Sequence, residues 1–271
     1  MQLGISTASF FSKYTTEDTF QIISDLGLNV CELFLTTKYE YNPKFIDLIV
    51  EKSNLFNIDI YSLHALGTQF EPELFNKVKR TFDDALEYFK LIANAAKKTQ
   101  AKYYTFHGPM KLKKKTYHLD YQYLGERITL LNNIIKDITL NKCEIAYENV
   151  HWTYFDNPNF YTTLRKNCNV SCCLDIKQAF QSKISVYDYI ESMKDGLKNI
   201  HICDYNDDGE LKLPGEGIFD FVSFFEFLYS IQYKGPIILE LYAYNYSNIN
   251  EIGKSLEYLK KCLEIAGKNY K

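Results

Sequence analysis

Short apolar runs rich in Val, Ile, Tyr and Phe recur along the chain, and each is followed by a longer segment with apolar residues at helical spacing. The pattern therefore alternates between strand and helix. The runs expected to form strands are 2–6, 30–35, 59–64, 103–107, 144–149, 170–175, 199–203 and 236–241. Helices are expected to begin near Thr16, Pro43, Pro72, Leu119, Asn157, Ser185, Phe219 and Ile249, several of which are residue types that favour helix N-termini.

This alternation, with no long linker, predicts a parallel sheet whose strands are joined by right-handed helical crossovers. Eight such units are the number that closes a barrel, so we expect a single (β/α)8 TIM barrel that spans residues 1–271 as one domain. The rival fold is an open, doubly wound sheet, in which a ligand binds at one switch point fed by two neighbouring loops. The placement of polar residues decides between the two folds.

Ionisable residues occur at or near the ends of the expected strands, where a strand buried on both faces should be apolar. In a barrel, every strand end can contribute to one central site. A single such residue is as readily explained by a hydrogen-bonded polar group in the core. Their repetition at equivalent positions of different strands favours a barrel with a shared site, built from Glu32, His64, His107, Glu148, Asp175, His201 and Glu240.

Four of these residues, from the last four expected strands, form the candidate metal site: Glu148, Asp175, His201 and Glu240. Three carboxylates and one imidazole make a hard, anionic ligand set that suits one divalent ion, Mn²⁺, Mg²⁺ or Co²⁺, and admits Zn²⁺. No thiolate belongs to the set, which is unlike a structural zinc site. The alternative is four separately neutralised core residues, but three carboxylates buried together without a cation are costly.

Composition narrows the classes of partner. The formal net charge of −3 does not indicate a surface for binding nucleic acid or a membrane. The seven cysteines form no paired CxxC spacing, so reduced thiols and a cytoplasmic location are expected. No signal peptide and no apolar stretch of about 18 residues are visible. We expect a small-molecule substrate, no nucleic-acid or membrane partner, and leave assembly into a homo-oligomer open.

Several motifs resemble the xylose isomerase-like barrel superfamily, which contains sugar isomerases, epimerases, inosose dehydratases and endonuclease IV. The motifs are those of its ketose 3-epimerase branch, and the resemblance covers nearly the whole chain. They are Glu148-Asn149, Leu174-Asp175, His201-Ile-Cys-Asp204, Glu240, and the stretch Leu213-Pro-Gly-Glu-Gly217 followed by Phe219-Asp-Phe221.

The resemblance implies a sugar isomerase or epimerase that depends on one divalent metal and acts on a ketose or related polyol ketone. The reaction would pass through a cis-enediolate that the metal stabilises, with Glu148 and Glu240 as acid and base. Substrate contacts are expected from His64, His107, Gln178, Glu32, Glu216 and Trp152. Gln178 stands where family members commonly have a histidine.

Three other functions stay open at this point. A lyase like the inosose dehydratases would use the same metal and enolate but lose a hydroxyl group as water. A phosphodiesterase like endonuclease IV would need three metals and basic groups at the mouth, which only the run Lys111-Leu-Lys-Lys-Lys115 offers. A sugar-binding barrel without catalysis is the third, because a fold does not fix a function.

Overall fold

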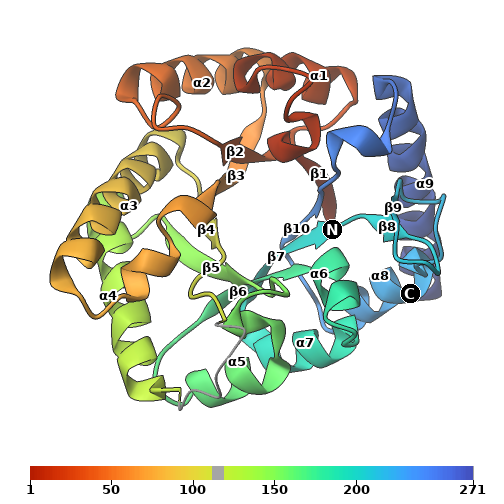
Figure 1. Ribbon diagram of the computed structural model, residues 1–271. Coiled ribbons are helices and arrows are strands. Elements are labelled where there is room, and N and C mark those ends of the chain that lie inside the picture. Colours follow the sequence, from red (N-terminus) through yellow and green to blue (C-terminus); the bar gives the residue numbers. More distant parts are fainter. Residues whose placement is uncertain (112–118, 271) are drawn as a thin grey trace.

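Eight parallel strands close into a barrel in the computed structural model, which describes residues 1–111 and 119–270. The strands are β1 (Gln2–Ser6), β2 (Val30–Leu35), β3 (Asp59–Ala65), β4 (Tyr103–Phe106), β5 (Glu144–Glu148), β6 (Ser171–Asp175), β7 (Leu197–Ile202) and β10 (Pro236–Leu239). Figure 1 looks approximately along the barrel axis and shows the helices as an outer ring around the strands. The expected (β/α)8 fold is confirmed, and the open-sheet alternative is wrong.

The helices of this ring are α1 (Thr19–Asp25), α2 (Pro43–Phe56), α3 (Lys79–Thr99), α4 (Tyr121–Thr139), α5 (Pro158–Leu164), α7 (Val186–Met193), α8 (Phe221–Ser230) and α9 (Ile249–Asn269). Several of these helices begin with a residue whose side chain caps the first turn. Asn42 accepts a hydrogen bond from the Lys44 amide at the start of α2, and Ser185 accepts one from the Tyr187 amide at the start of α7. These caps satisfy amides that have no partner inside the helix.

One helix starts later than expected, and one helix was not expected at all. Pro72 begins a 3-10 turn, Pro72–Phe75, and the long helix starts only at Lys79. Between them the chain turns, because the Asn76 side chain accepts a hydrogen bond from the Val78 amide. A short helix, α6 (Ile176–Gln181), was not expected and follows β6 without a loop. Asp175 caps it by accepting a hydrogen bond from the Gln178 amide, 2.9 Å away.

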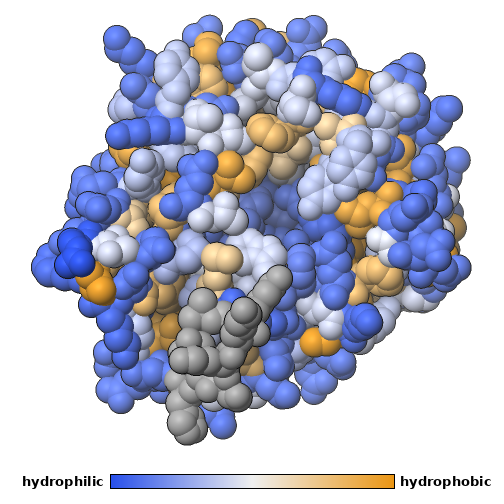
Figure 2. All heavy atoms as spheres, in the orientation of Figure 1, coloured by the Kyte–Doolittle hydropathy of each residue, from blue (hydrophilic) through white to orange (hydrophobic). Residues whose placement is uncertain are grey.

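The order of strands around the barrel is β1-β10-β7-β6-β5-β4-β3-β2. Barrel strands that are consecutive in the sequence are therefore also neighbours in the barrel. Large apolar side chains fill the space between strands and helices, among them Phe89, Tyr104, Tyr147 and Phe224. The centre of the molecule is different: Figure 2, in the same view, shows it hollowed, with hydrophilic side chains inside. The polar residues of the expected site lie at this end.

One buried carboxylate, Asp204, organises the loop between β7 and α8. That loop contains the two-stranded hairpin of β8 (Asp204–Tyr205) and β9 (Leu211–Lys212). Asp204 accepts hydrogen bonds from the backbone amides of Tyr205, Gly215, Gly217 and Phe219. Gly217 approaches so closely that a Cβ atom there would lie 2.3 Å from an Asp204 oxygen. The Asp204 carboxylate therefore holds the loop.

Replacing Asp204 with Asn should loosen this loop, because an amide can accept the loop's hydrogen bonds through only one oxygen and carries no charge. We expect a loss of about 3 kcal/mol in the free energy of unfolding. Amide hydrogen exchange at Gly215, Gly217 and Phe219 should become faster. Asp208→Asn, in the exposed hairpin turn, is the matched control and should change neither quantity. Unchanged exchange in Asp204→Asn would contradict this account of the loop.

Candidate metal centre

The barrel brings Glu148, Asp175, His201 and Glu240 together. Glu148 ends β5, Asp175 ends β6, His201 lies in β7, and Glu240 directly follows β10. Since these four strands are consecutive around the barrel, their ends meet on one side of its mouth. One candidate ligand atom from each residue can be chosen so that all lie within 4.8 Å of one another.

The burial of this cluster supports a cation at its centre. Glu148, Asp175 and His201 are almost fully buried. Within the described residues, Oε2 of Glu148, Oδ2 of Asp175 and Nδ1 of His201 make no hydrogen bond. The first two have only ion-pair contacts, with His107 and Lys177. Buried polar atoms are rarely left so, and converging carboxylates repel one another unless a positive charge lies between them. A divalent metal fits the three unsatisfied atoms and the hard donor set.

Beneath the cluster, the barrel interior holds the fully buried Glu32 carboxylate. It accepts hydrogen bonds from the side chains of Ser62 at 2.8 Å, Thr105 at 2.7 Å and Asn199 at 3.2 Å. Its Oε2 also lies 3.1 Å from Nε2 of His201. These donors come from three different strands. The residue predicted to contact substrate is therefore a buried anchor below the site.

The Glu32 contact fixes how His201 faces the cluster. Because a carboxylate only accepts, Nε2 of His201 carries the hydrogen of this pair. Nδ1 then points to the centre, 3.8 Å from an oxygen of Glu148 and 3.8 Å from one of Glu240. A carboxylate that holds the second ring nitrogen in this way is a common support for metal-binding histidines.

Two further histidines, His64 and His107, form one wall of the site. Their Nε2 atoms lie 3.0 Å apart, so only one of the two carries the shared hydrogen. Nε2 of His107 also lies 3.2 Å from Oε2 of Glu148, and Nδ1 of His64 lies 3.6 Å from Oε1 of Glu240. Each candidate acid–base glutamate thus has a histidine beside it.

His107 is positioned in turn by Glu71, a buried residue that the sequence did not indicate. Oε2 of Glu71 accepts a hydrogen bond from the His107 amide, and Oε1 accepts one from the Tyr104 hydroxyl. Burial raises the pKa of Glu71, although the nearby His107 opposes this shift. Trp152 packs edge-on against the other side of the His107 ring, with the ring centroids 5.4 Å apart.

Burial and neighbouring charges shift the pKa values of the three carboxyl groups in the cluster. Burial would raise the pKa of Glu148, but the close contacts with His107 and His201 outweigh it and hold the pKa well below the usual range. Burial is likewise outweighed at Glu240, mainly by the Lys177 charge, so its pKa is lowered. Burial raises the pKa of Asp175 to about 7, with Glu148 and Glu240 adding to the effect. Glu148 and Glu240 are therefore held as carboxylates at neutral pH.

A cavity of about 310 Å³ opens above the cluster. Its polar lining comprises His64, His107, Glu148, Lys177, Gln178 and Glu240, and its apolar and aromatic lining includes Phe11, Phe34, Leu66, Trp152 and Tyr242. The volume is at the small end of the range for ligand pockets. An ionic floor with an apolar rim suits a small polar molecule that has an apolar face.

Of the remaining residues predicted to contact substrate, two line the cavity and one does not. Gln178 and Trp152 line the cavity. Gln178 has its side-chain oxygen occupied, because it lies 3.1 Å from the amide nitrogen and 2.7 Å from Nδ1 of His151. Glu216 is exposed on the loop after β9 and does not line the cavity. The structure therefore does not bring Glu216 to the site.

The most prominent residue missed from the sequence is Lys177, on the first turn of α6. Its side chain is 7% exposed, and its Nζ lies 3.0 Å from Glu240 and 3.3 Å from Asp175. Its side chain reaches the site because α6 begins directly at Asp175. Since α6 was not expected, the sequence pattern held no signal for Lys177.

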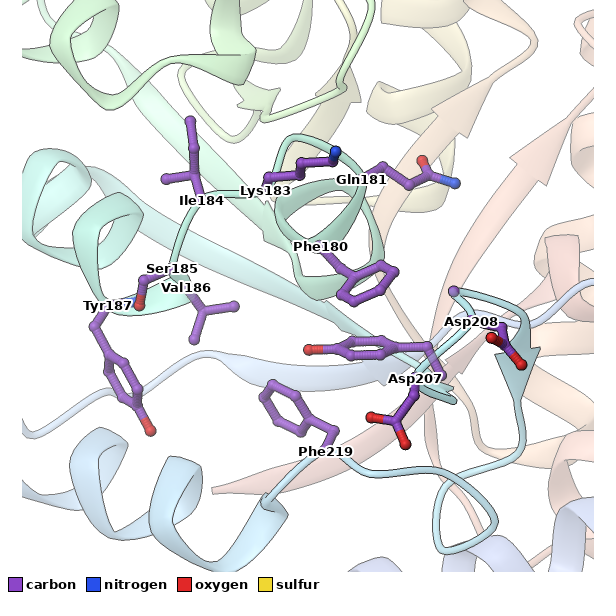
Figure 3. Close-up of a pocket in the computed structure, with 12 residues that line it drawn as sticks. Phe180, Gln181, Lys183, Ile184, Ser185, Val186, Tyr187, Asp207, Asp208 and Phe219 are labelled. Carbon is purple, nitrogen blue, oxygen red and sulfur yellow. The ribbon is translucent and has the colours of Figure 1, made fainter.

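A larger cavity, of about 760 Å³, lies outside the barrel mouth. It is bounded by α6, the start of α7 and the β8–β9 hairpin, and Figure 3 shows Phe180 and Phe219 projecting into this region. Phe180 stacks on Tyr205 with ring centroids 3.9 Å apart. None of the four candidate metal ligands lines this cavity, so it is separate from the site.

The basic run considered for a nuclease falls mostly outside the described residues. Residues 112–115 are not described, and Lys111 forms an ion pair with Asp156. Among the described helices, none is long and apolar enough to cross a membrane.

Comparison with known proteins gives the family. Residues 20–262 match the family described as "Xylose isomerase-like TIM barrel", and the chain belongs to it. No protein with a curated description matches the sequence.

Solved structures with a similar fold include a D-tagatose 3-epimerase-like protein, at 20% identity and a TM-score of 0.82, with both chains covered completely. A D-psicose 3-epimerase from Clostridium cellulolyticum H10 has 16% identity and a TM-score of 0.78, with 97% of this chain and 99% of that one covered. A probable 3-DHS dehydratase from Bacillus anthracis has 13% identity and a TM-score of 0.74, with 96% and 99% covered. At these identities the likeness establishes the fold.

Replacing Glu32 with Gln tests the anchoring of His201. The change removes the charge that holds Nε2–H, so Nδ1 should no longer be fixed toward the cluster. We expect divalent-metal affinity, measured by calorimetric titration, to fall by about 10- to 100-fold. Ser62→Ala removes one donor but keeps the carboxylate, and it should change the affinity by less than about threefold. Equal effects of the two changes would show that Glu32 does not orient His201.

Proposed function

We propose that this protein is a divalent-metal-dependent isomerase or epimerase that acts on a ketose or related polyol ketone. The observation that carries the proposal is the placement of Glu148 and Glu240. They come from β5 and from the end of β10, with β6 and β7 between them, and both line the same cavity. A substrate bound there would lie against both carboxylates.

Glu148, Asp175, His201 and Glu240 would hold the metal. When bound, a divalent ion would polarise the substrate carbonyl and so acidify the proton on the neighbouring carbon. These residues fit that role by their hard donor atoms and by the unsatisfied atoms of Glu148, Asp175 and His201.

The protein's own residues divide the proton transfer. One of Glu148 and Glu240 would remove the proton from the carbon beside the carbonyl, leaving a cis-enediolate. The other would return a proton, to the opposite face for epimerisation or to the adjacent carbon for isomerisation. The lowered pKa of both glutamates keeps them ionised, so either can accept a proton. The glutamate that returns a proton would first take one up from water in the open cavity.

His107 and His64 are placed to donate hydrogen bonds to substrate oxygens, since both rings line the cavity. Their shared contact of 3.0 Å limits how many hydrogens the pair can offer. Trp152 and Gln178 would complete the wall on the side of β5 and α6. Glu32 supports the site from below through His201 and takes no part in substrate contact.

The named neighbours are consistent with this reaction class. The structures similar to this chain include a D-tagatose 3-epimerase-like protein, a D-psicose 3-epimerase and an L-ribulose 3-epimerase. One neighbour is a probable dehydratase, and a dehydratase would share the enolate chemistry but expel water. Product mass separates the two, because epimerisation conserves mass and dehydration does not.

Glu148→Gln and Glu240→Gln should each lower turnover of a ketose substrate by about 10²- to 10⁴-fold, because each removes one proton-transfer group. The measurement is the exchange of substrate hydrogen for deuterium from heavy water, followed by NMR. Glu264→Gln, an exposed glutamate on α9, is the control and should exchange at the wild-type rate. Retained exchange in both site variants would end the proposal.

Removing divalent metal with a chelator should abolish the same exchange reaction. Adding back a single ion, with Mn²⁺, Co²⁺, Mg²⁺ and Zn²⁺ tested in turn, should restore it. The metal content of the active protein should approach one ion per chain. Three ions per chain would instead favour a phosphodiesterase, and full activity in the chelator-treated protein would exclude a metal-dependent reaction.

A further inference from the structure

Lys177 is the one described cation whose ammonium group contacts two of the candidate metal ligands directly. Its Nζ donates a hydrogen bond to Oε2 of Glu240 at 3.0 Å and lies 3.3 Å from Oδ2 of Asp175. The residue is only 5% exposed. A buried lysine is rare unless it is paired, so this placement needs a reason.

The charge of Lys177 compensates only part of the cluster. The three carboxyl groups of Glu148, Asp175 and Glu240 converge beside this single ammonium. A divalent ion can balance negative charge that the ammonium leaves. The contacts of Lys177 with two carboxylates place a positive charge directly against the candidate ligands.

A metal and this ammonium compete for the same oxygens. An ion held by Asp175 and Glu240 would lie a few ångströms from Nζ, and two positive charges at that distance repel each other in a poorly solvated site. The ammonium has room to move, since Lys177 lines the open cavity. Its Nζ already lies over the Tyr242 ring, 5.0 Å from the ring centre, and this contact could hold the ammonium when it leaves a carboxylate.

We propose that Lys177 is an exchangeable counter-cation of the metal centre. Without metal it holds Asp175 and Glu240 together, and metal binding displaces it from at least one of them toward the cavity. Lys177 thereby lowers the affinity of the site for divalent ions and stabilises its metal-free form. This inference rests on the metal centre of the proposed function, but it concerns metal binding and can be tested without a substrate.

The test is a calorimetric titration of the chelator-treated full-length protein with MnCl₂, for the wild type, Lys177→Met and Lys177→Gln. Both variants remove the competing charge, so each should bind Mn²⁺ at least about tenfold more tightly than the wild type. Lys183→Met, an exposed lysine shortly after α6, is the matched control and should bind like the wild type. Two neutral variants are used so that poor folding of one does not decide the result.

Thermal unfolding gives a second readout. The metal-free Lys177 variants should melt below the wild type, because Asp175 and Glu240 lose their cation. Saturating Mn²⁺ should raise their melting temperature by more than it raises that of the wild type.

The outcomes separate the two proposals. Equal or weaker Mn²⁺ binding by the Lys177 variants, with a wild type that binds, would overturn the counter-cation role and leave the metal centre standing. Absence of Mn²⁺ binding in the wild type and in both variants would overturn the metal centre and this inference with it. Binding by the variants alone would support the inference in its strongest form.

Discussion

The contact between the Glu32 carboxylate and Nε2 of His201 is the interaction on which the rest of the site depends. It joins β2 to β7 across the barrel interior, where no water competes, and it leaves Nδ1 of His201 facing the candidate ligands. Ser62, Thr105 and Asn199 donate to the same oxygen, and Ser6 donates to the other, so the charge can be buried without an excessive cost. A barrel interior packed only with apolar residues would leave His201 free to rotate.

Above this anchor, the two candidate acid–base glutamates have unlike surroundings. Glu148 lies against His107, which Glu71 positions from behind. Glu240 lies against Lys177 and, at a longer distance, His64. Glu148 can exchange a proton with the adjacent histidine, whereas the closest partner of Glu240 is an ammonium group. The surroundings of the two carboxylates are therefore chemically asymmetric.

The sequence predicted those parts of the site that depend on strand periodicity. Glu148, Asp175, His201 and Glu240 stand out because an ionisable residue at the end of a buried strand is unusual. Lys177 and Glu71 could not be found in this way, because each lies on a short helical turn outside the strands. Glu216 lies away from the cavity: its flanking glycines serve the backbone contacts with Asp204, and its own side chain is exposed.

Family membership and local chemistry constrain the function to different degrees. The match to the xylose isomerase-like barrel gives the family, and the barrel places the four strand-end residues together. The residues beside them shape the cavity, and Gln178 there has its side-chain oxygen engaged by His151. Other groups are therefore left to hold a small molecule. The cavity offers the polar edge of His64 and His107 on one side and the rings of Phe11, Phe34 and Tyr242 on another. A sugar has the same division between hydroxyl edges and an apolar face, which is why a small carbohydrate suits this cavity better than an extended nucleic-acid strand.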